Sequence, residues 1–386
     1  MITTINNKLS IKTNLSYWAV LMVAMMGAAV TTLMPLMVGA FTDSQHFTTQ
    51  QVGFLTASDI AGILIASASA YFWVRRCHWQ KLVSFSLLLF IGANFATNWI
   101  NDFSTLILIR FIAGLACGVS YSIALAALGD RKSPDKAFGD MVTIQVIYGT
   151  LGFALLPSII EQWGYAGIFQ FFNVTLILAF LMTILAFPGS NKQQQSFDIE
   201  MRLIWQPTAL VFAGVVCYYF AQGTIWAYLE RIGVAGGLTL SEIGTLLAVG
   251  FAISAIGSWL SGWAVLRIGR PSAIWLTVVI QLPCLLALFY MEPSNAWMIY
   301  AFATIIYQIF WSFIVPVMMG IFNDVDKSGR LIVFCVTAFK VGLVIGPPVA
   351  GLVISMYSLN HVIGIGAIAI VASAIFLVLA DKKIAR

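Results

Sequence analysis

Arg110 is the residue of this chain whose position most needs a chemical explanation. It lies in the stretch Thr105–Gly118, which is otherwise nearly apolar and belongs to a segment long enough to cross a bilayer. A charged group at membrane depth costs at least a few kcal/mol and normally faces a protein interior or an aqueous cavity, so Arg110 is a candidate functional residue. Its small neighbours Ala113, Gly114 and Gly118 would let a second helix pack closely.

Two further charged residues, Asp59 and Lys340, also lie inside apolar runs. Each is about eight or nine residues from the end of its run, on the order of 13 Å along a helix, which brings it near the middle of a core of about 30 Å. Intramembrane carboxylates serve proton relays, so we expect Asp59 to carry a coupled proton. Two cations against one carboxylate leave a positive surplus, which favours an anionic substrate.

Aromatic and amide side chains gather on predicted helices of the second half. Their stacking surfaces and hydrogen-bond donors suit an amphipathic or aromatic acid. The alternative is that they only pack or lie at the interface, as aromatic residues do in any membrane helix. With the charged residues, and with Gln145 on the fifth predicted helix as a comparable candidate, they form the predicted substrate-binding or coupling set: Asp59, Arg110, Gln145, Tyr218, Gln222, Trp226, Gln308, Trp311 and Lys340.

The composition identifies the environment of these residues. Of 386 residues, 60% are hydrophobic and 9% charged, whereas about 25% are charged in a soluble domain. We therefore expect an all-α integral membrane protein. A run of about 20 apolar residues crosses a bilayer, and twelve such runs are present, at 17–39, 51–74, 82–99, 104–128, 138–160, 166–188, 207–229, 239–266, 272–291, 296–322, 331–355 and 360–380.

The basic residues predict the orientation of the chain. If the N-terminus is cytoplasmic, all twenty Lys and Arg residues except Arg110, Arg231 and Lys340 fall on the cytoplasmic side. We therefore expect both termini in the cytoplasm and the protein in a bacterial-type inner membrane. The net charge of +5 follows from this bias, so no nucleic-acid partner is expected.

A polar connection near the midpoint divides the chain into related halves. The predicted parts are a six-helix bundle at 1–188, a cytoplasmic linker at 189–206 and a second six-helix bundle at 207–386. Basic loops around Arg76 and Arg267 follow the second and eighth predicted helices, and Asp130 and Asp324 end the fourth and tenth. Two such repeats predict a binding site between the halves near the midplane.

Several glycine, proline and basic patterns carry a family resemblance. They are Arg110, Gly114 and Gly118 in the fourth predicted helix, a Gly/Pro segment from Gly342 to Gly351 in the eleventh, a degenerate loop pattern at Arg76 and Lys81, and a better copy at Gly262, Arg267, Gly269 and Arg270. On these residues the whole chain resembles the major facilitator superfamily (MFS) of transporters. The complete loop pattern and the first-helix acid of its drug/proton antiporters are missing, which lowers the weight on multidrug efflux.

The resemblance implies two pseudo-symmetric six-helix bundles that alternate access to a central site. In that fold the second and eleventh helices meet between the bundles, so Asp59 and Lys340 would approach in one conformation and separate in the other. Two alternatives stay open: a static pair, or neutralisation of Asp59 by Arg110 within the first half.

Charged residues at the cytoplasmic helix ends are expected to form gates. The predicted gate residues are Arg75, Arg76, Asp130, Arg267, Arg270 and Asp324. A loop arginine in each half can pair with the acid that ends the fourth helix of that half, or with a helix C-terminus. The alternative is that these charges only set the topology. Glu230 and Arg231 would form an external latch or a solvated cap.

These features together predict a secondary transporter that moves a small organic anion, with aromatic acids among the candidates, driven by protons. The alternative is export of drugs or metabolites by proton antiport. A membrane enzyme and a non-transporting sensor are remoter alternatives, because the sequence shows neither a cluster of catalytic residues nor a soluble signalling domain. Isolated histidines, five scattered cysteines and the lack of a phosphate loop predict no metal, disulfide or ATP site. We expect no cofactor, and a monomer whose partners are substrate, protons and lipid.

Overall fold

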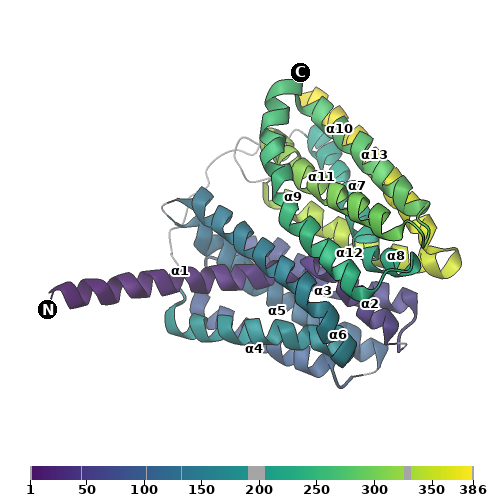
Figure 1. Cartoon of the computed structure of the whole chain (residues 1–386). Helices are drawn as coiled ribbons and strands as arrows, with labels where there is room; N and C mark the ends of the chain where they lie inside the picture. The colour runs from purple at the N-terminus through teal and green to yellow at the C-terminus, as the bar shows by residue number, and fades with distance from the viewer. Residues whose placement is uncertain are drawn as a thin grey trace. The chain divides into compact units, whose positions relative to one another are not determined.

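The computed structural model describes residues 2–44, 46–100, 102–131, 133–189, 205–325 and 332–384. These residues form thirteen helices: α1 (Ile2–Thr32), α2 (Met34–Asp43), α3 (Thr49–Trp73), α4 (Trp79–Thr97), α5 (Phe103–Gly129), α6 (Pro134–Ala186), α7 (Trp205–Ile225), α8 (Leu229–Ala235), α9 (Leu240–Ile268), α10 (Arg270–Phe289), α11 (Ala296–Val325), α12 (Ile332–Met356) and α13 (Leu359–Ile384) (Figure 1). Outside the described residues lie most of the predicted linker and the orienting cations Lys132, Lys192, Arg202, Lys327, Arg330 and Arg386.

The described residues contain eleven helical stretches that are long and apolar enough to cross a membrane. One of them, Lys136–Ala186, contains Gly164 at φ 59° and ψ −152°, which are not helical values. Glycine tolerates this backbone conformation, so α6 is two helices joined at a kink. The described part of the chain therefore holds twelve membrane-crossing helices, which confirms the predicted fold class.

The first predicted span differs from the structure at its start and in being broken part-way along. Helix α1 begins at Ile2, well before the predicted start at 17, because the polar residues that precede the span include neither glycine nor proline. The span is then broken between α1 and α2 at Leu33. Pro35 lies two residues further on and cannot donate a backbone hydrogen bond to the preceding turn, which accounts for the break.

Side-chain caps fix where two membrane helices begin. Asp102 precedes α5 and accepts a hydrogen bond from the Thr105 amide at 2.8 Å. Hydrogen bonds from the hydroxyl and amide of Thr105 hold the pKa of Asp102 below its usual range. Thr239 and Glu242 form a reciprocal capping box at the start of α9.

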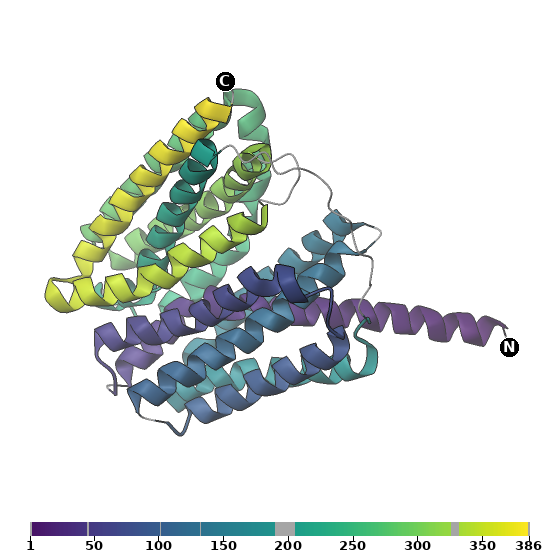
Figure 2. The same cartoon turned by 180° about the vertical axis from the view of Figure 1, so that it is seen from behind.

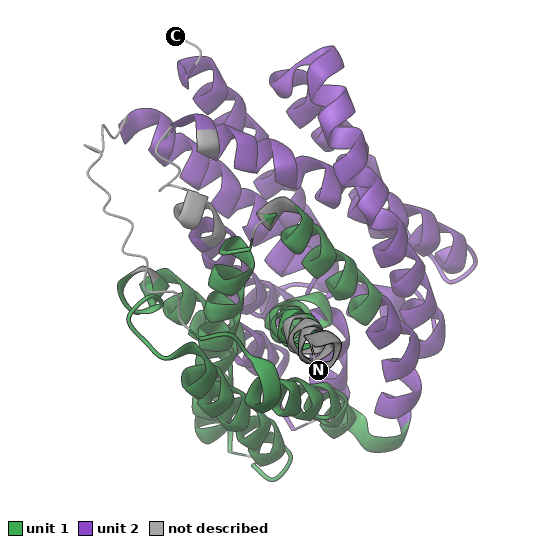
Figure 3. Ribbon diagram, turned by 90° about the vertical axis from the view of Figure 1, so that its left-hand side faces the viewer, with its two compact units in different colours: residues 1–33, 58–149, 162–196 green, residues 34–57, 150–161, 197–386 purple. Residues whose placement is uncertain are grey.

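The described chain forms two compact units, and unit 1 comprises residues 1–33, 58–149 and 162–196 (Figure 3). Within it, α3 and α5 pack at backbone distance. A methyl group at Gly114 of α5 would lie 2.0 Å from the Asp59 carbonyl oxygen, and one at Gly118 would lie 2.9 Å from the Ile63 Cα. The prediction that small residues admit a close helix is confirmed.

Unit 2 comprises residues 34–57, 150–161 and 197–386. Helix α7 packs against α12 and α13, and α9 packs against α11. Gly342 and Gly346 allow the α7–α12 contact, since a methyl group on either would lie 2.6 Å from the α7 backbone. Helices α10 and α13 run beside each other, as Figures 1 and 2 show.

The units do not share the boundaries of the predicted halves, because residues 34–57 and 150–161 group with unit 2. The first of these segments packs closely against α12: a methyl group at Gly53 would lie 2.4 Å from the Pro347 carbonyl oxygen. The organisation into two six-helix bundles joined by a linker stays a prediction.

Candidate functional site

The side chain of Arg110 is fully buried in unit 1 and donates hydrogen bonds to two neighbouring helices. Its Nη2 lies 2.7 Å from Oδ1 of Asp59 on α3, and its Nε lies 3.0 Å from the other oxygen of that carboxylate. Its Nη1 lies 2.9 Å from Oδ1 of Asn94 and 3.3 Å from Oγ1 of Thr97, both on α4. Four of the five guanidinium N–H groups therefore have acceptors.

Helix α6 completes the surroundings of this guanidinium. The Phe169 ring centroid lies 4.4 Å from Cζ of Arg110, within the range of a cation–π contact. Asn94 donates to Oδ1 of Asn173 at 3.0 Å, which turns the Asn94 oxygen toward the arginine. Nδ2 of Asn173 has no hydrogen-bond partner among the described residues. Side chains from α3, α4 and α6 thus converge on Arg110 of α5.

The Arg110–Asp59 pair is almost completely withdrawn from solvent, with side-chain exposures of 0% and 1%. A buried ion pair is tolerated when further hydrogen bonds satisfy its remaining donors, and Asn94 and Thr97 supply them here. Of the arrangements left open for Asp59, the structure shows its pairing with Arg110. The sequence analysis did not single out Asn94 and Thr97, although their spacing of three residues places them on one face of a helix.

A second buried polar cluster joins α7, α10 and α11 in unit 2. Nε2 of Gln222 donates to the Tyr307 hydroxyl at 2.9 Å, and Nε2 of Gln281 donates to the Tyr218 hydroxyl at 3.0 Å and to the Tyr307 carbonyl at 3.2 Å. All four residues are buried. The cluster brings together the predicted Tyr218 and Gln222, and it adds Gln281, which the sequence analysis did not single out.

Gln308 on α11 is buried, at 2% exposure, but it is not satisfied. Neither its Nε2 nor its Oε1 has a hydrogen-bond partner among the described residues. Gly250 of α9 faces this amide, and a methyl group there would lie 2.6 Å from Nε2. An unsatisfied buried polar group costs about 1–3 kcal/mol, so this amide is a candidate for binding a polar group from outside the chain.

The other predicted binding residues lie on α6, α11 and α12 and in the turn that follows α7. Gln145 donates to the Ala24 carbonyl at 3.0 Å within unit 1. In unit 2, the Trp226 ring meets the Phe153 ring edge-on at 5.8 Å, and Trp311 is half-buried. Lys340 lies on α12 at 9% exposure. It belongs to unit 2 and Asp59 to unit 1, so their approach stays a prediction.

Each unit forms the arginine–aspartate pair expected at its helix ends. Arg75 binds both oxygens of Asp130 at 2.5 and 2.8 Å in unit 1. Arg270 pairs with Asp324 in unit 2 and lies 3.7 Å from Asp381. The remaining predicted gate residues are differently placed: Arg76 is exposed, and Arg267 lies over the Trp263 ring at 5.5 Å. The role of these residues as gates stays a prediction.

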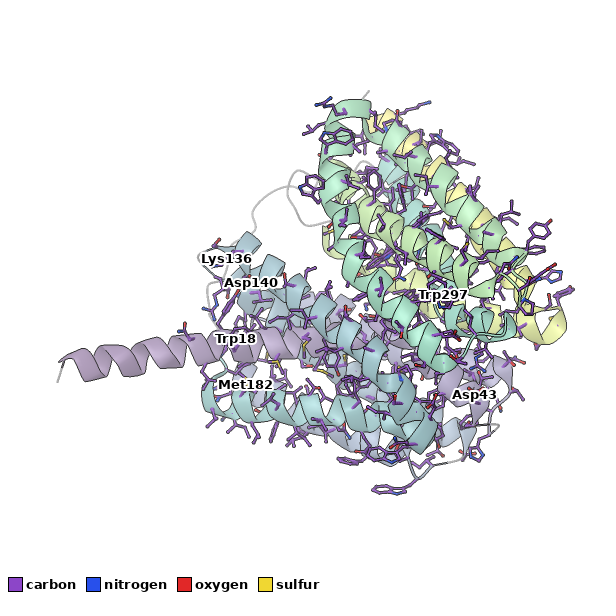
Figure 4. The ribbon with its side chains drawn as sticks, viewed as in Figure 1. Trp18, Asp43, Lys136, Asp140, Met182 and Trp297 are labelled. Atoms are coloured by element: carbon purple, nitrogen blue, oxygen red, sulfur yellow. The ribbon has the colours of Figure 1, made fainter. Side chains whose placement is uncertain are left out.

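Glu230 and Arg231 belong to a three-residue ionic cluster with Asp43. Asp43, which Figure 4 labels, is the last residue of α2. Nη1 and Nη2 of Arg231 lie 2.6 and 2.9 Å from the Asp43 oxygens. The same guanidinium lies 2.6 Å from each Glu230 oxygen. Glu230 is fully buried, so it is not the solvated cap offered as one alternative. Sequence reasoning missed Asp43 because no pattern linked it to α8.

Groups of three His, Cys, Asp or Glu side chains that could hold a metal are absent from the described part of the chain. Sequence comparison adds the family. The family model described as Major Facilitator Superfamily matches residues 19–327. The chain belongs to this family. Its curated relatives include the uncharacterized MFS-type transporters YE1530 of Yersinia enterocolitica, 22% identical over 250 residues, and YcaD of Escherichia fergusonii, 21% identical over 255 residues. Each alignment covers 63% of both chains.

Solved MFS structures share the fold of this chain at low sequence identity. A D-xylose-proton symporter aligns with a TM-score of 0.74 and 13% identity, over 96% of this chain and 97% of its own. A point mutant of the nucleoside transporter NupG aligns with a TM-score of 0.77 and 11% identity, over 94% and 99%. A bacterial homolog of the human lysosomal transporter Spinster, inward-facing and occupied, gives 0.74 and 13%, over 95% and 96%.

Proposed function

We propose that the protein is a secondary active transporter that moves a small organic anion across the inner membrane, coupled to protons, by alternating access of its two halves. Family membership supports the transporter class, and the symporter among the fold neighbours supports proton coupling. The proposal depends above all on one observation: Arg110, Asp59 and Lys340 are all buried within apolar helices.

The charge of the substrate follows from the balance of these three residues. Asp59 neutralises Arg110 through two hydrogen bonds, and Lys340 adds one further positive charge on α12. A carboxylate on the substrate could pair with this second cation at membrane depth. We therefore assign Lys340 to the substrate carboxylate. In the orientation that we propose, both termini and the two arginine–aspartate pairs at the helix ends lie on the cytoplasmic side.

Proton coupling is assigned to Asp59. A buried carboxylate beside a cation stays ionised, and one that loses its cation takes up a proton. A conformational change that pulls Asp59 away from Arg110 and leaves it without a cation would link proton uptake to the switch between states. Asn94 and Thr97 hold the arginine in place while its carboxylate partner changes.

The rest of the substrate is assigned to unit 2. Gln308 offers a donor and an acceptor that the described chain leaves unused, and the Tyr218, Gln222 and Tyr307 cluster lies on the same pair of helices, α7 and α11. An aromatic acid would use both kinds of surface: the amide for a polar substituent and the tyrosine rings for stacking.

Ligand-induced stabilisation of the purified protein tests the substrate class. We expect aromatic and aliphatic carboxylates, but not their amides, to raise the melting temperature, and Lys340→Gln to weaken the response at least about tenfold in ligand concentration. Lys81→Gln, which removes an exposed charge on α4, is the matched control. Stabilisation by cationic drugs alone would refute the anion assignment and favour proton-antiport export.

A further inference from the structure

A cavity of about 570 Å³ lies on unit 2 beside α10 and α13, and its lining includes none of the charged residues assigned to transport. Its walls include Ile268 at the end of α9, Trp275, Leu276 and Val279 on α10, and Val378 on α13. Its volume is within the range of small-molecule binding sites, roughly 300–1,000 Å³. None of these residues takes part in the polar clusters of the candidate functional site.

The wall of this cavity is exposed where membrane helices meet lipid. Ile268, Trp275 and Val279 are 46%, 40% and 65% exposed, although all three are large and apolar. They belong to helices that are long and apolar enough to cross the bilayer. Lipid chains are therefore the molecules that surround this wall, and an apolar concave surface gives a chain better contact than a flat helix face.

One end of the cavity carries a cation without a partner in the described chain. Lys382 lines it from the last turn of α13 and is exposed. The cations beside it are already engaged: Lys383 donates to Gln206 at 2.8 Å, and Arg270 pairs with Asp324 and Asp381. Lys382 makes no hydrogen bond or ion pair with any described residue, so its charge is available to an anion.

We propose that this cavity, an open groove between α10 and α13, binds one anionic phospholipid, with the phosphate on Lys382 and an acyl chain along Trp275 and Val279. The two parts of the site match the two parts of the ligand: a cation lies where α10 begins and α13 ends, and the apolar wall runs from there into the membrane span. Trp275 lies about one turn inside α10, near the end of a membrane helix. Tryptophan is enriched at this depth, at the boundary between lipid headgroups and acyl chains.

Native mass spectrometry of the delipidated full-length protein, titrated with phosphatidylglycerol or phosphatidylcholine of identical chains, tests this site. We expect the first phosphatidylglycerol molecule to bind with higher affinity than the first phosphatidylcholine molecule. Lys382→Gln should weaken the affinity for phosphatidylglycerol about fivefold, as expected for one basic residue at a membrane surface. Lys383→Gln removes the same charge one residue away and should leave the affinity unchanged, since that side chain is engaged by Gln206.

A second variant tests the apolar half. Val279→Trp fills the groove at an exposed position, so it should reduce the binding of both lipids without lowering the melting temperature. Equal affinity for the two lipids, or an equal loss in Lys382→Gln and Lys383→Gln, would overturn the proposal, because either result means that surface charge alone attracts the lipid. A dimer that resists added lipid would also overturn it, with a second copy of the chain as the occupant.

Discussion

Removal of Arg110 should destabilise the protein far more than removal of any surface arginine. Arg110→Gln leaves the Asp59 carboxylate, 1% exposed, without its cation, and takes the donor from Asn94 and Thr97. Breaking a buried ion pair by deleting one partner costs about 3–5 kcal/mol. At about 2–4 °C per kcal/mol for a unit of this size, the melting temperature should fall by roughly 6–20 °C.

The double variant Arg110→Gln/Asp59→Asn distinguishes an ion pair from a packing effect. Both side chains are then neutral and of similar volume, so at least half of the loss should be recovered. Arg75→Gln is the matched control: its pair with Asp130 is 43% and 24% exposed and should contribute no more than about 1 kcal/mol. Thermal melting in detergent, followed by tryptophan fluorescence, measures all four proteins. Equal losses in the single and double variants would refute the interpretation of Arg110 as a charge neutralised by Asp59.

Three further predictions follow from contacts elsewhere in the structure. Gly114→Ala should lower the free energy of unfolding by about 1–3 kcal/mol in thermal melts, because the added methyl group would lie 2.0 Å from a backbone carbonyl oxygen. Gly139→Ala is the control, since no atom lies within 4 Å of its methyl group, and equal effects of the two variants would contradict the close packing. Glu230→Gln should destabilise the protein more than Asp43→Asn, since these side chains are 0% and 59% exposed; the reverse order in the same melts would exclude a buried latch. Burial raises the pKa of the Cys77 thiol, so in a single-cysteine variant its reaction with an impermeable maleimide should be slow at pH 7 and rise with pH; rates equal to those of free cysteine would contradict this.

The helices could be predicted from the sequence because hydropathy alone determines which segments can cross a bilayer. The break in α6 at Gly164 falls between two predicted spans, as expected for a glycine that leaves helical geometry. The break at Leu33 was missed, although Pro35 signalled it. Apolar composition does not reveal a helix boundary within an apolar run. A proline does, because it lacks the backbone N–H that would continue the hydrogen bonding of the helix.

The partners of the charged residues could not be predicted in the same way. Position along the predicted helices placed Asp59 and Lys340 at similar depths in the membrane, but depth does not say which helices face each other. The pairing of Asp59 with Arg110 depends on Gly114, whose missing side chain brings α5 against the α3 backbone at Asp59 itself. The motif was visible in the sequence, whereas the geometry that it permits was not. Gln281 was missed for a related reason, since a single amide in an apolar run has no pattern of its own.

Internal pH in proteoliposomes tests the central claim, that this chain moves organic anions together with protons. Addition of a carboxylate substrate outside should acidify the lumen, and Asp59→Asn should abolish the acidification while Asp102→Asn, an exposed helix cap that asparagine can also serve, preserves it. If carboxylates leave the internal pH unchanged and only cationic drugs move protons, or if Asp59→Asn acidifies as fast as the unaltered protein, the account of the substrate or of the coupling residue is wrong.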